Sequence, residues 1–455
     1  MPTASNVSRF SRRAIFADCR RTLRMALPLM AAQVLQSSNG IVDALVAGRL
    51  GRDELAAGGI GAGMWFFSSL ICIGLIAGLS PTLSKLIGER RRNAVGACFR
   101  QGIWLGVFCG LASLILCLAI AFSVPYWKLA DDLAPLIQQY MFAACWSMPA
   151  FAMVMVCRNV FEATGITRPV LIVQMVGVLV NLLGNLGFGL GWFGLPKLGL
   201  VGIGLSTTFV FLAMAFVLFW FMRGPRFLRY QLFAQFERID INAQKIMLVL
   251  SVPIFFALLF EAGLFAATAI QMGLLGSEES AAHNISISIS ALTYMLPLGM
   301  SFAITARIGH VYGRGLASSI RLRVTSGLLL MVMLAGTTAL ILLATRHALP
   351  TLYTTDESVK SLAATLLIFA ALFQLSDGAQ AVLMGMLRGL QDTRIPMLIN
   401  AFSYWGVAFL LGYFAANHWG MGATGLWMGL VIGLSVSSLL LGMRLRDRLR
   451  AYDNA

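Results

Sequence analysis

Apolar residues occur along this chain in runs of about 20 or more, separated by short polar or charged segments. A helix rises about 1.5 Å per residue, so such runs are long enough to cross a ~30 Å hydrocarbon core. They are too long for the alternating strands of a membrane β-barrel. The pattern predicts an all-α polytopic membrane protein with twelve transmembrane helices, at roughly 25–48, 57–83, 101–124, 134–157, 169–191, 199–222, 246–273, 281–306, 324–345, 361–386, 397–416 and 422–443.

The longest internal polar stretch, 223–245, divides these helices into two sets of six. We therefore expect a basic N-terminal segment at 1–24, a first lobe at 25–222, a linker at 223–245, a second lobe at 246–443 and a basic tail at 444–455.

The two sets resemble each other, which indicates an internal duplication. Pro28 precedes Gly51 by the same spacing as Pro253 precedes Gly276. Three further matches follow in the same order, at offsets between 221 and 226: Ala56-Ala57 with Ala281-Ala282, Gly78-Leu79-Ser80 with Gly299-Met300-Ser301, and Thr167-Arg168 with Thr393-Arg394. Because each set has an even number of helices, both sets share one orientation, and we expect two pseudo-symmetric bundles with a substrate cavity between them.

Composition and charge agree with a membrane protein. The chain is 58% hydrophobic and 12% charged, with a mean hydropathy of +0.81, which excludes an ordinary soluble domain. The net charge of +15 is a topology signal, because all but six of the 34 Lys and Arg residues adjoin the side that holds the N-terminus. Both termini are therefore expected in the cytoplasm, and no nucleic-acid partner is expected. The six on the other side are Arg49, Arg52, Lys128, Lys197, Arg346 and Lys360.

Three carboxylates fall inside the predicted helices: Asp43, Glu261 and Asp377. Glu261 lies near the middle of the seventh, where an ionisable side chain costs at least a few kcal/mol unless something compensates it. A protonated or hydrogen-bonded structural acid is one reading, and a site for a transported cation is the other. For Asp43, near the outer end of the first helix, a solvated or capping acid is an equal alternative.

Polar stripes accompany these acids. Gln33, Gln36, Asn39 and Asp43 share one face of the first helix, and Gln36 is the repeat counterpart of Glu261. On the tenth helix the stripe consists of Gln374, Asp377 and Gln380.

The fifth helix presents Asn181 and Asn185 on one face, and Thr207 follows on the sixth helix. Asparagines that bond across helices and a threonine that bonds its own backbone would also explain these residues. We expect His283 at the interface, next to Asn284, and Asp356 in an outer loop that is either simply solvated or an acidic patch at the cavity mouth.

A carboxylate in a low-dielectric site can bind a proton, and two carboxylates with amide oxygens can hold a small hard cation. A bulky organic cation would then compete for the same negative charge, which is the physical basis of antiport. The sequence contains no Walker, HExxH or GxSxG motif, which argues against ATP-driven transport and against an enzyme.

The chain resembles the multidrug and toxic compound extrusion (MATE) transporters, NorM-like branch. The resemblance covers nearly the whole sequence and rests on PLMAAQVLQSSNGIVDALVAGRLG at 28–51, FEATGITRP at 161–169, NLLGN at 181–185, GLVGIGLSTT, LFEAGLF at 259–265, AAHNIS at 281–286, LYTTD at 352–356 and MLRGLQDTRIP at 386–396.

The resemblance implies a V-shaped pair of six-helix bundles in the bacterial inner membrane, without cofactor and as a monomer, that exports cationic drugs and dyes in exchange for Na⁺ or H⁺. It implies that Glu261 and Asp377 are the cation-coupling acids of the second lobe, and these two would be the metal ligands if the coupling ion is Na⁺. It assigns Asp43, Asn181, Asn185 and Thr207 to a polar cluster in the first lobe. We add Gln36, Gln374, Asn284 and Asp356 as substrate-contacting or supporting residues.

The coupling ion stays open between Na⁺ and H⁺. Phe373 stands where some Na⁺-coupled members have a tyrosine, whereas two acids in one lobe favour Na⁺. The alternative function is a flippase for lipid-linked precursors, which would be expected to place several Arg or Lys residues in its cavity; the predicted helices are acidic instead.

Overall fold

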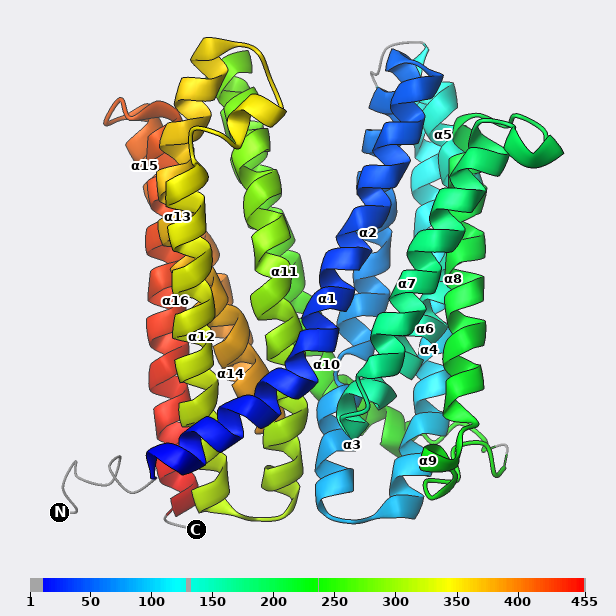
Figure 1. Ribbon diagram of the computed structural model, residues 1–455, viewed down its shortest axis with the longest axis vertical. Coiled ribbons are helices and arrows are strands. Elements are labelled where there is room, and N and C mark those ends of the chain that lie inside the picture. Colours follow the sequence, from blue (N-terminus) through cyan, green and yellow to red (C-terminus); the bar gives the residue numbers. More distant parts are fainter. Residues whose placement is uncertain (1–10, 128–131, 236, 454–455) are drawn as a thin grey trace. The chain divides into compact units, whose positions relative to one another are not determined.

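The computed structural model describes residues 11–127, 132–235 and 237–453, and these residues form an all-helical protein (Figure 1). Its α-helices are α1 (Arg12–Leu50), α2 (Arg52–Ile76), α3 (Leu79–Gly88), α4 (Arg92–Ser123), α5 (Leu133–Ala144), α6 (Ser147–Thr164), α7 (Arg168–Gly184), α8 (Leu200–Met222), α9 (Pro225–Leu228), α10 (Ile241–Leu275), α11 (Ser277–Gly313), α12 (Ala317–Thr345), α13 (Glu357–Gly389), α14 (Arg394–Ala401), α15 (Leu410–Asn417) and α16 (Gly422–Asp453). Two π-helical segments, Asn185–Gly189 and Phe402–Phe409, extend α7 and connect α14 to α15.

Among the described residues, ten helices, counted across short breaks, are long and apolar enough to span a membrane, or eleven if α5 and α6 form one bent span. The bend between α5 and α6 is 48°. Of the twelve predicted helices, only the first has no counterpart in this set. It lies within α1, whose length suffices, but its stripe of amides and Asp43 lowers the hydropathy of the segment.

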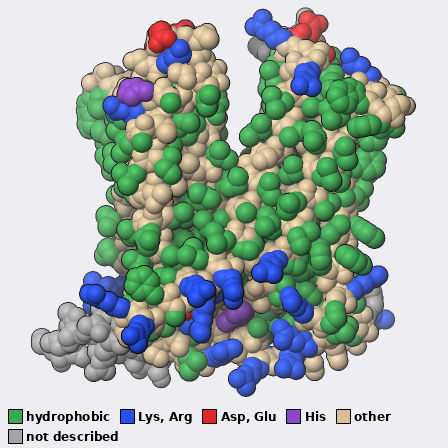
Figure 2. All heavy atoms as spheres, viewed as in Figure 1, with side chains coloured by type: hydrophobic (Ala, Val, Ile, Leu, Met, Phe, Trp, Pro, Cys, Tyr) green, Lys and Arg blue, Asp and Glu red, His purple; other side chains and the backbone are tan. Residues whose placement is uncertain are grey.

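Hydrophobic side chains cover the middle of each visible helical surface, and Lys and Arg side chains lie toward helix ends (Figure 2). This distribution is the one expected for helices that cross a bilayer, with charged ends in the interfacial regions.

Two compact units make up the chain. The N unit comprises Ala31–Phe255, and the C unit comprises the residues from Phe256 onward together with the part of α1 up to Met30. The division therefore falls inside α1 and α10, each time two residues after a proline, Pro28 or Pro253. The linker at 223–245 lies within the N unit instead of separating the units.

Glycines allow the exchanged helix ends to pack closely in their units. A Cβ on Gly74 would lie 2.6 Å from the Cα of Phe255, within the N unit. A Cβ on Gly299 would lie 2.6 Å from the Cα of Met30, within the C unit. The two glycines are 225 residues apart, and so are the two residues they touch, so the same close approach occurs in both units. The structural counterpart of Gly299 is therefore Gly74, and the sequence match of Gly299 with Gly78 is shifted by one helical turn.

The backbone repeats as well. Residues with a left-handed φ recur at matching positions: Arg90 (60°) with Gly315 (68°), and Gly165 (76°) with Gln391 (61°). Such angles are unfavourable for most side chains, so their recurrence reflects the same turn geometry in both halves.

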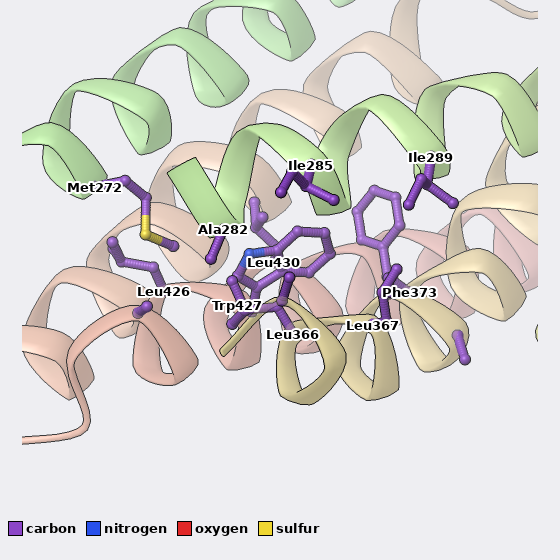
Figure 3. Close-up of a cluster of buried hydrophobic side chains, with 14 of the residues drawn as sticks. Met272, Ala282, Ile285, Ile289, Leu366, Leu367, Phe373, Leu426, Trp427 and Leu430 are labelled. Atoms are coloured by element: carbon purple, nitrogen blue, oxygen red, sulfur yellow. The ribbon is translucent and has the colours of Figure 1, made fainter. Parts of the chain in front are cut away.

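Each unit has its own apolar core. In the C unit, Trp427 and Phe373 are almost fully buried, with ring centroids 6.0 Å apart, and aliphatic side chains from α11, α13 and α16 surround them (Figure 3). In the N unit, Tyr140, Met141 and Ile203 belong to a similar cluster.

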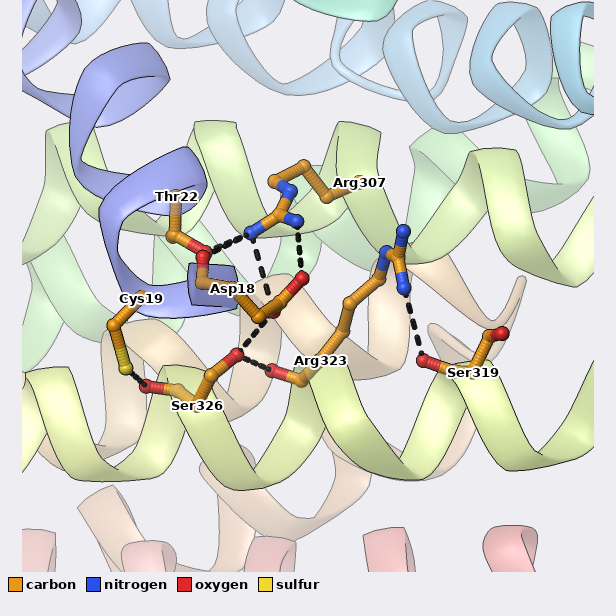
Figure 4. Close-up of polar contacts among 7 residues, drawn as sticks. All are labelled: Asp18, Cys19, Thr22, Arg307, Ser319, Arg323 and Ser326. Carbon is orange, nitrogen blue, oxygen red and sulfur yellow. Dashed lines mark hydrogen bonds and ion pairs between the residues drawn. The ribbon is translucent and has the colours of Figure 1, made fainter. Parts of the chain in front are cut away.

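Polar contacts hold the first part of α1 in the C unit (Figure 4). Asp18 is buried and pairs with Arg307, whose Nη2 lies 2.6 Å from Asp18 Oδ1. Ser326 Oγ donates to Asp18 Oδ2 at 2.5 Å, and Arg307 also donates to the hydroxyl of Thr22. Cys19 Sγ lies 3.7 Å from the carbonyl oxygen of Ser326.

The linker is fastened to α4 in the N unit. Arg100 Nη2 lies 2.5 Å from Glu237 Oε1, Gln101 Nε2 donates to the carbonyl of Arg238 at 2.8 Å, and Trp104 Nε1 donates to the carbonyl of Glu237 at 3.0 Å. The hydrogen bond from Arg100 lowers the pKa of Glu237 below its ordinary value, so this carboxyl is an anion at neutral pH.

Candidate functional site

The two acids of the C unit lie in one cluster. Glu261 on α10 and Asp377 on α13 interact electrostatically with each other, and both interact with the hydroxyl groups of Tyr294 on α11 and Tyr404. Asp377 is 5% exposed. Within the described residues, neither carboxylate forms a hydrogen bond or an ion pair with a Lys or Arg side chain. Arg388 interacts with Glu261 over a longer range.

This donor set suits a small cation or a proton. Two carboxylates and two phenol oxygens are hard oxygen ligands, the kind that Na⁺ accepts. No group of three His, Cys, Asp or Glu side chains gathers anywhere in the described part of the chain, so a tightly chelated transition metal has no site there.

Tyr294 and Tyr404 were not predicted as site residues from the sequence. Phe373, at the position considered for a hydroxyl, is 2% exposed and packs in the apolar core against Phe265 and Trp427. Tyr294 and Tyr404 supply hydroxyls instead, and Gln380 donates to the Tyr404 hydroxyl. Both tyrosines lie inside apolar runs, away from the interfaces where membrane tyrosines concentrate, and that placement was the available signal.

The remaining C-unit candidates have separate roles in the structure. Gln374 donates to the carbonyl of Ser290 at 2.8 Å and to the hydroxyl of Thr293 at 2.6 Å, so it joins α13 to α11. Asn284 is exposed.

Asp356 is the N-cap of α13 and accepts from the backbone N–H of Ser358 at 2.9 Å. Hydrogen bonds from the Ser358 hydroxyl and from backbone amides lower the pKa of Asp356, as expected for a capping carboxylate.

His283 is not interfacial as expected: it is 2% exposed, and its ring lies 5.9 Å from that of Trp427. It is buried because α11 begins at Ser277, which places His283 more than one turn inside the helix against the C-unit core. The hydroxyl of Ser286, which follows, donates to the carbonyl of Ala282 one turn earlier, at 2.9 Å.

In the N unit, Asp43 is held by two asparagines. Its Oδ1 accepts from Asn181 Nδ2 at 2.9 Å and from Asn185 Nδ2 at 2.6 Å. Asn185 lies four residues after Asn181, at the start of the π-helical segment, and this spacing places both side chains on the same side. Asp43 therefore bonds across helices and does not cap one. Thr207 bonds back to the carbonyl of Ile203 at 3.2 Å, and Tyr140 joins it to the cluster by a hydrogen bond.

A second ionic group in the N unit was not foreseen. Arg158 and Glu162 on α6 pair at 2.7 Å, and Glu162 is 3% exposed. Arg158 also donates to Gln33 at 2.5 Å and to Gln36 at 3.2 Å, both on α1. The predicted fourth helix ended at residue 157, so both charges were assigned to a loop, whereas α6 continues to Thr164.

Comparison with known proteins identifies the family. A family model described as MatE matches residues 28–186 and 253–414, two stretches that begin one repeat offset apart. The chain belongs to the MatE family. It is a transporter family, and the chain is not an enzyme.

Relatives of this MatE protein extend over its full length. A protein named probable multidrug resistance protein NorM from Xanthomonas campestris pv. campestris is 36% identical over 438 residues, which cover 95% of each chain. Multidrug resistance protein MdtK from Yersinia pestis is 32% identical over 438 residues, 94% of this chain and 95% of MdtK. NorM-like proteins from several bacteria match similarly, which agrees with a multi-pass membrane protein of bacterial type.

Solved MATE structures share the fold. The eukaryotic MATE transporter AtDTX14 superimposes with a TM-score of 0.87 at 16% identity, covering 96% of this chain and 99% of AtDTX14. The Vibrio cholerae MATE transporter VcmN in its bent form superimposes with a TM-score of 0.85 at 17% identity, covering 97% and 99%.

Proposed function

We propose that this MatE protein is a secondary antiporter that exports cationic, amphiphilic drugs and dyes in exchange for Na⁺ or H⁺ by alternating access. The carboxylates of Glu261 and Asp377 support this proposal most directly, because they interact with each other and neither forms an ion pair with a Lys or Arg side chain among the described residues. Two acids in low dielectric are tolerable if a mobile positive species visits them. The names of the NorM and MdtK relatives, which refer to multidrug resistance, agree with this reading.

Coupling follows from competition for negative charge. With the ion bound, the acids are neutralised and a cationic drug is released; without it, they attract the drug. Na⁺ is favoured for the C unit by its two carboxylates, which offer hard oxygen ligands, whereas Asp43, with two asparagine donors, suits a proton or an ion held more weakly.

The setting of the proposed transporter is the bacterial inner membrane, with both termini in the cytoplasm as the basic segments indicate. One chain contains both halves, so we expect it to act as a monomer. A lipid flippase is less well supported, because the buried Arg158 is paired with Glu162 and does not form a cationic surface for pyrophosphate.

The decisive experiment is dye exchange in liposomes containing the purified protein. Efflux of ethidium should start when a Na⁺ gradient or a pH gradient is imposed separately, which also identifies the coupling ion. We expect Glu261→Gln and Asp377→Asn to lose ion-driven efflux, whereas the capping variant Asp356→Asn keeps it. Full efflux by both neutral variants would disprove the proposed mechanism.

A further inference from the structure

Polar side chains of the N unit form a continuous row between two ionic clusters. On α1, Gln36, Asn39 and Asp43 recur at spacings of three and four, so they lie on one face. Gln36 accepts from Arg158 at one end of the row, and Asp43 accepts from asparagines of α7 at the other. The row spans seven residues, or about 10 Å of helix.

Helix α7 supplies a second row that faces the first. Gln174 lies seven residues before Asn181, which is two helical turns, so both point to the same side. Gln174 is 5% exposed, and its amide makes no hydrogen bond within the described residues. The Oδ1 atom of Asn39 is likewise buried without a partner.

A small cavity lies between these rows. Its lining includes Gln36, Asn39, Arg158 and Gln174, with Phe151 and Phe211 on the apolar side. The free volume of ≈ 20 Å³ is enough for a water molecule, and unpartnered amide atoms on its wall supply the polar contacts such a water requires. Water there would connect Arg158 with Asn39, which lies one helical turn before Asp43 on α1.

Arg158 closes this row on the side where α6 ends. Only six residues separate Arg158 from Thr164, or about 9 Å of helix, and the turn to Arg168 follows. The guanidinium is held from both sides: Glu162 accepts from Nε, and the Gln33 and Gln36 amides accept from the two terminal nitrogens. Glu162 balances this charge at Nε, but the two terminal nitrogens are directed at the α1 amides, so a cation that approaches along the row meets the positive end of the ion pair.

We propose that Arg158 is an electrostatic plug that separates the Asp43 site from the cytoplasmic side, and that Glu162 with Gln33 and Gln36 holds it in place. This inference rests on the proposed antiport, because a tight barrier is what prevents the ion gradient from dissipating without drug export. Arg158 acts as a positioning and barrier residue; it does not itself carry the ion.

The test measures ion leak without drug. Liposomes that contain the full-length protein and entrapped pyranine receive a potassium diffusion potential through valinomycin, and proton entry is recorded; parallel samples record ²²Na⁺ entry. Wild type should be tight. We expect Arg158→Gln to raise the leak of one of these ions at least tenfold, and Arg158→Lys, which keeps the charge, to remain within about twofold of wild type.

A double variant tests whether a leak in Arg158→Gln arises only from misfolding. Arg158→Gln alone removes one charge of a buried ion pair, so Arg158→Gln/Glu162→Gln, which removes both charges, is measured beside it. The exposed Arg168→Gln at the start of α7 is the matched control and should not leak. Adding Asp43→Asn to the leaking variant should restore tightness if the ion passes Asp43.

Failure of the plug and failure of the antiport proposal give different results in these assays. A folded double variant that stays tight for both ions overturns the plug, and so does a leak that persists with Asp43→Asn. Absence of gradient-driven ethidium efflux in the wild type would instead remove the antiport proposal, whatever the leak assay gives.

Discussion

Removing the carboxylate of Asp18 should release the first part of α1 from the C unit. Asp18 Oδ1 lies 2.6 Å from Arg307 Nη2, and Oδ2 accepts from Ser326 at 2.5 Å. The Arg307 side chain is 11% exposed, and Arg323 adds a like charge nearby. Asp18→Ala therefore leaves one poorly solvated guanidinium unpaired beside another, and breaking a buried pair in this way costs about 3–5 kcal/mol.

The native thiol of Cys19 reports this release directly. Cys19 is 6% exposed and lies against Ser326, so a maleimide reaches it only when this part of α1 opens. A cost of about 3–5 kcal/mol corresponds to a labelling rate roughly 10²- to 4 × 10³-fold faster, at ~1.4 kcal/mol per factor of ten. Ser326→Ala, which removes a single hydrogen bond, should give a rise of about tenfold.

Cys157 provides the control within the same molecule, because it is fully buried on α6 in the N unit. Mass spectrometry of the labelled peptides separates the two cysteines. The reasoning fails if Cys19 in Asp18→Ala reacts within threefold of the wild-type rate. Equal acceleration at Cys157 would also refute it, because the whole protein would then have been destabilised.

Three further outcomes follow from contacts described above. Glu237→Gln should make the linker more sensitive to limited proteolysis at pH 7. In the wild type the same sensitivity should appear in acid. The Arg100 contact contributes its full stability above the ordinary carboxyl pKa of about 4.3, and this contribution is lost as the pH falls through the lowered pKa of folded Glu237. Gly299→Val should cost about 1–3 kcal/mol by overpacking and lower the melting temperature, whereas Gly336→Val, with open space at its Cβ, should not. Gly165→Ala should cost about 1–2 kcal/mol because its φ is left-handed, and a melting temperature equal to wild type would contradict that assignment.

Much of the architecture could be predicted because a helix that crosses a bilayer must be apolar over most of its length, and such a run is visible in the sequence. The apolar runs, the basic loops and the repeat led to the helical fold, and the cost of buried charge drew attention to Asp43, Glu261 and Asp377. Helix-face spacing also brought Asn181 and Asn185 together correctly.

What could not be predicted depends on three-dimensional contacts between distant segments. Tyr294 and Tyr404 enter the C-unit cluster from the apolar runs 281–306 and 397–416, which hold no acid, so their position inside those runs was the only local signal. Hydropathy ended the fourth helix before Arg158, because a charge within an apolar run lowers the average whether or not a partner neutralises it. The same average cannot show that His283 is covered by Trp427.

The division points after Pro28 and Pro253 have a consequence for how such a protein is assembled. Cutting the chain at the linker would give two fragments, each lacking one helix segment that its own bundle requires and carrying one that belongs to the other. Neither fragment should therefore be stable when made alone, whereas both produced together should reconstitute the transporter. If the two halves arose from a six-helix ancestor, two copies of that ancestor would have exchanged these helix segments. Such an ancestor would have been an obligate dimer before its gene was duplicated and fused.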